Sequence, residues 1–224
     1  MLRLALACCA LTFSATAAAE PTWKDVEATR DWKRISVRNH EDAGPITVYA
    51  ATIAGTPCFR ALADTPAPAD VLLEVAADIV GSLEWSSAGL SRSEVLAADN
   101  DSVDYLQYLD LPGWTLSRDR FWILRGTVTR EGRTRRFTWQ RLGEQGGPHR
   151  ARFLALEEET NAIEPPVNLG GWEFVRSEGE TRVRYTICTD SGGSLPRSFQ
   201  NLATRTTLPD TVGDLIREGL RRSP

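Results

Sequence analysis

The order of elements that the sequence predicts is typical of an α+β fold in which a curved antiparallel sheet wraps around a long C-terminal helix. Three strand-like segments come first, an amphipathic helix and a run of further strands follow, and a second amphipathic segment ends the chain. A sheet that curves around a helix can leave space between the two. We therefore expect an internal apolar cavity, which is the usual place for a ligand.

The first 19 residues are typical of a secretory signal. Arg3 is followed by an apolar run from Leu4 to Phe13 and by small residues that end at Ala19, the pattern of a cleavable leader. The run is shorter than the roughly 20 apolar residues that a membrane span needs. We expect cleavage after Ala19 and a mature protein in the periplasm or outside the cell.

The remaining residues, 20–224, have a length typical of one domain and contain no linker or repeat. The formal net charge is −4, and basic residues alternate with acidic ones. This pattern argues against a nucleic-acid partner, which would call for a basic stripe. We expect a single domain that acts as a monomer.

The first half of the domain contains three predicted strands and one helix. The strands are Trp32–Arg38, Ile46–Ala54 and Phe59–Ala63, rich in β-branched and aromatic residues. The helix begins near Pro66–Asp70, and its apolar residues recur at helical spacing. They are Val71, Leu72, Val75, Ala76, Ile79, Val80 and Leu83.

A run of strands then leads to the last helix. The predicted strands are Ser93–Ala98, Val103–Leu109, Arg120–Thr129, Thr134–Arg141, His149–Leu156 and Thr181–Thr189. The glycines of Asp190–Gly193 indicate a turn into the helix, which we expect Pro209 to kink or split.

The end of the chain resembles a START (lipid-transfer) domain, a family within the helix-grip, Bet v 1-like superfamily. In that family a tryptophan-containing strand precedes a strand that closes on Asp-x-Gly-Gly-x-Leu-Pro, and an asparagine follows. The matching residues here are Trp172, Asp190, Gly192, Gly193, Leu195, Pro196 and Asn201. The resemblance implies a helix-grip fold whose C-terminal helix roofs a lipid cavity.

A second matching segment, Leu111–Phe121, indicates one polar site residue. Aligned on Trp114, Ser117 and Phe121, it places Arg125 where sterol-binding members carry an arginine inside the cavity. Alternation then puts Phe121, Ile123 and Arg125 on one face. An inward arginine needs a partner, and Tyr105 and Gln107 lie on the neighbouring strand. The alternative is an exposed arginine at the sheet edge whose stem covers apolar surface.

Aromatic and aliphatic residues from several elements are predicted to line the same cavity. They are Tyr105, Phe137, Trp139, Tyr185, Phe199, Leu202, Leu215 and Ile216. Plain core packing is the alternative for most of them. The resemblance also indicates a gate loop over Leu111–Leu116, whose Pro112 and Trp114 suit transient contact with a membrane surface. An ordinary surface loop is the alternative.

Two cysteines, Cys58 and Cys188, remain after cleavage. In the START arrangement the third strand lies beside the last, which brings the two cysteines together. Both also share a strand face with arginines, which indicates the solvent side. A cross-strand disulfide is consistent with an oxidising compartment, and two separate thiols are the alternative.

Catalytic signals are weak. His40 and His149 are the only histidines, too few for a metal site or a His-based triad, and phosphate-binding glycine motifs are lacking. We expect no cofactor and no metal. The sequence predicts a non-catalytic protein that binds and transfers a lipid, sterol-like or fatty-acyl ligand. The alternative is a helix-grip enzyme of the aromatase/cyclase type, which needs polar groups that converge near Arg125.

Overall fold

The computed structural model contains one nine-stranded antiparallel sheet and five α-helices in the part of the chain that it describes. That part comprises residues 20–111, 113, 117–190, 192 and 197–223, with the backbone alone at 144 and 197–204. The predicted signal segment, Pro112, Trp114, Gly193, Leu195 and Pro196 lie outside the described residues, as do the side chains of Phe199, Asn201 and Leu202.

The strands follow one another around the sheet except at one place. They are β1 (Lys33–His40), β2 (Gly44–Ile53), β3 (Thr56–Thr65), β4 (Leu90–Ala98), β5 (Ser102–Leu109), β6 (Arg120–Glu131), β7 (Thr134–Arg141), β8 (Val167–Arg176) and β9 (Thr181–Asp190). Their order in the sheet is β1-β2-β3-β9-β8-β7-β6-β5-β4. The pairing of β3 with β9 therefore joins the N-terminal strands to the C-terminal ones.

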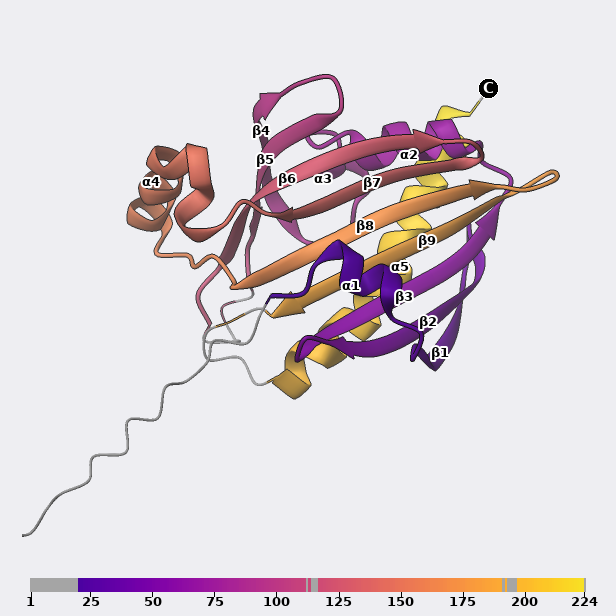
Figure 1. Cartoon of the computed structure of the whole chain (residues 1–224), viewed down its shortest axis with the longest axis horizontal. Coiled ribbons are helices and arrows are strands. Elements are labelled where there is room, and N and C mark those ends of the chain that lie inside the picture. Colours follow the sequence, from indigo (N-terminus) through magenta and orange to yellow (C-terminus); the bar gives the residue numbers. More distant parts are fainter. Residues whose placement is uncertain (1–19, 112, 114–116, 191, 193–196, 224) are drawn as a thin grey trace, which may run out of the picture.

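Helices cover both faces of the sheet (Figure 1). The C-terminal helix α5 (Arg197–Arg222) runs across the inner face, where α2 (Ala69–Ala77) packs against it and the short α3 (Ser82–Trp85) follows. The outer face carries α1 (Trp23–Ala28) and α4 (Arg150–Thr160), which follows the 3-10 helix η2 (Glu144–His149). This arrangement confirms the predicted α+β layout with a curved antiparallel sheet around the last helix.

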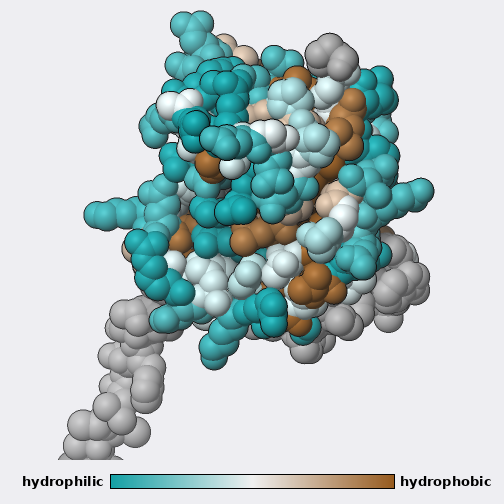
Figure 2. Space-filling view, turned by 90° about the vertical axis from the view of Figure 1, so that its right-hand side faces the viewer, coloured by the Kyte–Doolittle hydropathy of each residue, from teal (hydrophilic) through white to brown (hydrophobic). Residues whose placement is uncertain are grey.

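The core of the inner face joins α2 and α5 to the sheet. Leu72 and Val75 from α2 and Leu215 and Ile216 from α5 are fully buried against it. Each such apolar side chain contributes roughly 1.5–3 kcal/mol when it is removed from water. Figure 2 shows that hydrophilic side chains cover most of one face of the molecule and that hydrophobic side chains emerge between them in patches.

The segment His149–Leu156, predicted as a strand, is instead helical: His149 ends η2, and the residues from Arg150 on begin α4. Phe153 and Leu156 are the buried residues of this helix, and a spacing of three places both on one helical face. They pack with Phe121 and Ile123 on the outer face of the sheet. The prediction was wrong because the few apolar residues of this segment fit a short helix as well as a strand.

The two remaining helix predictions also need correction. The helix predicted to include Val80 and Leu83 breaks at Asp78, whose carboxylate accepts a hydrogen bond from the Gly81 N–H at 3.0 Å, and both apolar residues are exposed. The last helix is not split, because α5 continues through Pro209, and a kink at Pro209 stays a prediction.

Cys58 and Cys188 face each other across the β3–β9 pair and form a disulfide. The prediction that they lie on the solvent side needs correction. Both are fully buried on the outer face with Val26 of α1 and Leu169 of β8. Because α1 covers this part of the sheet, the outer strand face is not the solvent face here.

Candidate ligand-binding cavity

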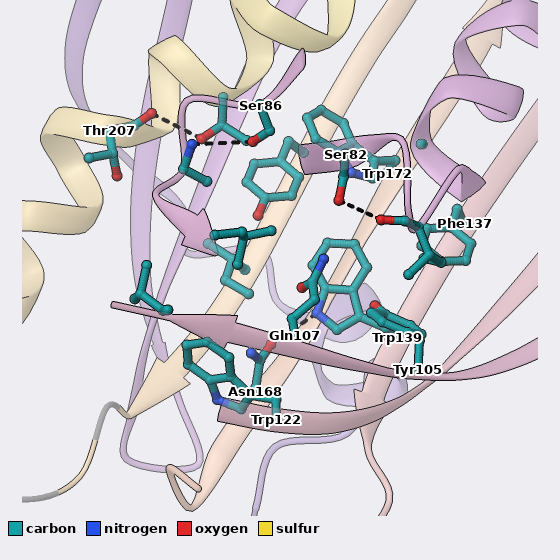
Figure 3. A pocket seen from close by; sticks show the side chains of 18 of the residues that line it. Ser82, Ser86, Tyr105, Gln107, Trp122, Phe137, Trp139, Asn168, Trp172 and Thr207 are labelled. Carbon is teal, nitrogen blue, oxygen red and sulfur yellow. Dashed lines mark hydrogen bonds between the residues drawn. The ribbon is translucent and has the colours of Figure 1, made fainter. Parts of the chain in front are cut away.

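A cavity of about 380 Å³ lies between the inner face of the sheet and the helices α2, α3 and α5 (Figure 3). Strands β5–β9 form one wall, Ile79, Ser82 and Trp85 form a second, and Thr207 and Leu208 of α5 contribute a third. The space that the sequence predicts is therefore present and is not filled by the surrounding aromatic rings.

Aromatic side chains form most of the sheet wall of this cavity. The rings of Trp172 and Tyr185 stack with centroids 4.1 Å apart, and the Trp139 ring lies 6.0 Å from that of Tyr185. Phe137 continues the row at 6.0 Å from Trp139, and Tyr105 follows at 6.4 Å from Phe137. A row of neighbouring rings presents a broad apolar surface to a ligand.

Two glycines make room for this row. A Cβ atom at Gly126 of β6 would lie 2.6 Å from the ring of Phe137, and one at Gly170 of β8 would lie 2.3 Å from the ring of Trp139. Such distances are well inside van der Waals contact. The glycines therefore let the aromatic side chains lie close against neighbouring strands, which helps to leave the space above them open.

The polar groups of the wall are mostly neutral. Trp139 donates from its indole nitrogen to the Asn168 side-chain oxygen at 2.9 Å, and Ser82 donates to the Ile79 carbonyl at 2.6 Å. Burial raises the pKa of the Tyr105 hydroxyl well above its usual value, and burial likewise raises that of Tyr185. Both phenols are neutral near pH 7.

Asp78 is the one carboxylic acid among the described residues that line the cavity. It pairs with Arg222 at the C-terminal end of α5, at 2.9 Å, so its charge already has a partner. A ligand inside the cavity therefore meets rings, aliphatic groups, hydroxyls and amides, and the arrangement favours a largely apolar and uncharged molecule.

The structure places five of the predicted site residues on the cavity wall: Tyr105, Gln107, Phe137, Trp139 and Tyr185. Leu215 and Ile216 are fully buried in the core between α5 and the sheet and do not line the cavity. The predictions for Phe199, Leu202, Pro112 and Trp114 concern side chains outside the described part of the chain.

Phe121, Ile123 and Arg125 lie on the outer face of β6, so the prediction that they face the cavity is wrong. Phe121 and Ile123 pack beneath α4. Trp122, on the opposite strand face, lines the cavity instead. The alternation along β6 is as predicted, but its inward and outward faces are exchanged.

Arg125 pairs with a buried acid on the neighbouring strand. Its guanidinium donates to both carboxylate oxygens of Asp104, at 2.6 and 2.8 Å, and His149 lies 2.9 Å from the same carboxylate. The hydrogen bond from Arg125 holds the pKa of Asp104 below its usual value. The alternative interpretation of the sequence is right that Arg125 is exposed, since its side chain is 46% exposed, but wrong about the sheet edge, because β6 lies between β5 and β7.

Sequence reasoning missed several cavity residues. Trp85, Trp122, Trp172 and Asn168 all line the space. Trp172 could have been found, because it shares a face with Phe174 and lies directly opposite Tyr185 in the β8–β9 pair. The position of Trp85 on the cavity wall depends on the break between α2 and α3, and the helical periodicity of the sequence does not indicate that break.

Within the described residues, no group of three or more His, Cys, Asp or Glu side chains is placed to hold a metal ion. The described helices include none with the length and apolar character of a membrane span.

The fold is similar to solved structures of START proteins. A STAR-related lipid transfer protein from Xanthomonas axonopodis superimposes with a TM-score of 0.68 and 20% identity, over 85% of this chain and 99% of that one. Human StAR-related lipid transfer protein 5 gives a TM-score of 0.68 at 14% identity, over 88% of this chain and 92% of that one. The chain therefore has the START, or helix-grip, fold that its C-terminal motif indicates.

The same fold also occurs in an enzyme. The Zhui aromatase/cyclase from a Streptomyces species aligns with a TM-score of 0.53 and 13% identity, over 74% of this chain and 94% of that one. No family model matches the chain. An uncharacterized protein of Pseudomonas aeruginosa is 24% identical over 174 residues, which cover 76% of this chain and 78% of that protein.

Proposed function

We propose that this protein binds a hydrophobic, largely uncharged ligand in the cavity and transfers it between membranes, without chemical change to the ligand. The observation that carries the proposal is the open space of about 380 Å³ behind a row of aromatic rings. The volume lies near the lower end of the roughly 300–1,000 Å³ that drug-sized ligand pockets occupy. It favours a sterol-like or single-chain molecule over a lipid with two acyl chains.

Two features favour a carrier over an aromatase/cyclase. The polar cluster that such an enzyme needs near Arg125 does not form in the cavity, because Arg125 binds Asp104 on the outer face. The cavity phenols of Tyr105 and Tyr185 have raised pKa values and so make poor bases near neutral pH.

Mass spectrometry of the protein purified from its own host tests the binding. We expect denaturation to release one apolar molecule per chain. Replacement of the cavity residue Ile187 by Trp should fill the space and abolish recovery, and Val95→Trp, which adds the same ring at an exposed site on β4, should not. Equal recovery from both variants, or none from the wild type, would refute the cavity as the binding site.

Transfer needs a separate experiment. Vesicles loaded with the recovered molecule should lose it to acceptor vesicles faster in the presence of the protein, and Ile187→Trp should slow this exchange. An enzyme would instead convert the molecule, so its recovery unchanged after incubation distinguishes the two functions.

We also propose that the mature protein begins at Glu20 and acts in the periplasm or outside the cell. The apolar leader and the buried Cys58–Cys188 disulfide support this location, since disulfides persist in oxidising compartments. Cell fractionation with mass spectrometry of the N terminus is the test. An intact leader on cytoplasmic protein would contradict the proposal.

A further inference from the structure

A second pocket lies on the outer face of the sheet, on the opposite side from the apolar cavity. Its volume is about 260 Å³, and its walls come from α1 and from strands β3, β7, β8 and β9. A water molecule occupies about 30 Å³ of liquid volume, so the pocket can hold a polyatomic ion together with several waters.

The side chains around this pocket carry an excess of positive charge. Arg30, Arg60, Arg136 and Arg184 line it, against Glu27 and Glu173. Four positive and two negative groups leave an excess of two positive charges. The chain as a whole has a net charge of −4, so this pocket differs in sign from the average of the molecule.

Three of these arginines, Arg60, Arg136 and Arg184, lie on strands of the sheet, and one glutamate pairs with two of them. Glu173 accepts from Arg136 with one carboxylate oxygen at 2.7 Å and from Arg184 with the other at 2.6 Å. Arg60 takes part in none of the ion pairs seen in the described part of the chain. It donates to the Thr186 hydroxyl at 3.2 Å, and its guanidinium stacks on the Trp32 ring at 3.9 Å.

Burial and the nearby charge of Arg184 lower the pKa of Arg60 to about 10. The group is still cationic at pH 7. Both causes disfavour the charged form of Arg60 more than nearby Glu173 favours it, and an anion beside the guanidinium would offset them.

The position of α1 makes this charged surface a pocket. Gly171 of β8 forms part of the floor, and a Cβ atom there would lie 2.8 Å from the Trp23 ring of α1. Because Gly171 has no side chain, Trp23 can rest on the sheet and α1 can cover the arginines. Partial removal from water strengthens the attraction between guanidinium groups and an anion.

We propose that this outer-face pocket binds a phosphate group, held by Arg60, Arg136 and Arg184. The planar guanidinium fork matches phosphate oxygens with paired hydrogen bonds, and the Thr186 hydroxyl beside Arg60 offers a further polar contact. The group can belong to a soluble phosphate compound or to the headgroup of a phospholipid. In either case the site is separate from the apolar cavity, so it does not depend on the function proposed above.

Titration with inorganic phosphate tests the site, with calorimetry and thermal shift as the two measurements. Chloride at equal ionic strength is the control anion. We expect saturable binding, and Arg184→Gln and Arg60→Gln should each weaken it about tenfold or more. Arg182→Gln is the matched control. Arg182 lies on the same strand, 60% exposed and paired with Asp64, and it does not line the pocket. Circular dichroism checks that each variant is folded. If one of the two pocket variants does not fold, the other is enough for the test.

Vesicles distinguish the two sources of phosphate. Co-sedimentation uses phosphatidylcholine vesicles with and without phosphatidic acid at constant salt. If the protein binds phosphatidic acid, the pocket variants weaken this binding and inorganic phosphate binds little, the site takes a lipid headgroup. If inorganic phosphate binds and the vesicles do not, the site takes a soluble compound. The proposal is overturned if neither probe binds, or if Arg182→Gln weakens binding as much as Arg184→Gln.

Discussion

Individual side chains in this sheet take their role from the face on which they lie. On β5, Tyr105 lines the cavity, and its neighbour Asp104 holds Arg125 on the outer face. The Arg125–Asp104 pair stabilises the pairing of β5 with β6, since the two residues are register partners.

Replacing Arg125 by Leu should therefore lower stability and leave ligand binding unchanged. The change removes two charge-assisted hydrogen bonds from a carboxylate that is only 6% exposed. Because Arg125 itself is half exposed and His149 remains beside Asp104, we expect a loss of about 1–2 kcal/mol in the free energy of unfolding. Urea unfolding and lipid binding measure the two effects. Lost lipid binding at full stability would show that Arg125 acts on the ligand.

Gly170→Ala should reduce the capacity of the cavity. The new methyl group would press on the Trp139 ring, which must move toward the space above it, and overpacking of this kind costs about 1–3 kcal/mol. We expect weaker lipid binding and a lower Tm.

Gly171→Ala is the matched control for this variant. Its methyl group would press on Trp23 on the outer face, so it should lower the Tm without weakening lipid binding. Equal loss of lipid binding in both variants would indicate general destabilisation and not a smaller cavity.

At the scale of elements, the disulfide links the two halves of the sheet. Cys58 of β3 and Cys188 of β9 are separated by 130 residues, and β3–β9 is the pairing that joins the N-terminal strands to the rest. A cross-link over such a long loop restricts the unfolded chain strongly.

Replacing both cysteines by Ala should lower the free energy of unfolding by about 2–4 kcal/mol. Reduction of the wild type should have a similar effect, and adding reductant to the double variant should have none. Urea unfolding with and without reductant measures these differences. An unchanged wild type under fully reducing conditions would show that the strand pairing alone holds the two halves together.

The predictability of each element depended on how many of its faces are covered. Thr134–Arg141 matches β7 residue for residue, and Tyr185 was placed correctly, because β9 has a nearly complete alternation of apolar and polar residues. On β6 both faces are buried, one by the cavity wall and one by α4. The alternation of side chains along the strand then identifies β6 but does not show which of its faces points into the cavity. The sequence therefore predicts Arg125 on the wrong face.

Local sequence also contained little signal for the elements that cover the outer face. The segment that forms α4 buries only Phe153 and Leu156, which is too few apolar residues to define a helical period. α1 is six residues long and was not predicted. Its capping box at Thr22 and Asp25 is visible in the sequence, but a helix so short depends on packing against the sheet.

For the whole molecule, the sheet separates two environments. The inner face forms a neutral, aromatic cavity against α5, and the outer face carries a buried disulfide and a positively charged pocket beneath α1. An apolar ligand and an anion would therefore bind on opposite sides of the same strands. Either one should stabilise the folded state by an amount that grows with the logarithm of its free concentration above its Kd, since each binds that state alone.

An apolar ligand in the cavity should accordingly raise the Tm of the whole domain. At a free concentration a hundred times its Kd, it adds about 2.7 kcal/mol, which corresponds to a rise of about 5–11 °C for a domain of this size. Differential scanning calorimetry with the lipid recovered from the host measures the shift. The Val95→Trp variant should show the same rise, and Ile187→Trp should show none because its cavity is filled. An equal rise in both variants would place the bound lipid outside the cavity, because only one of them has the space removed.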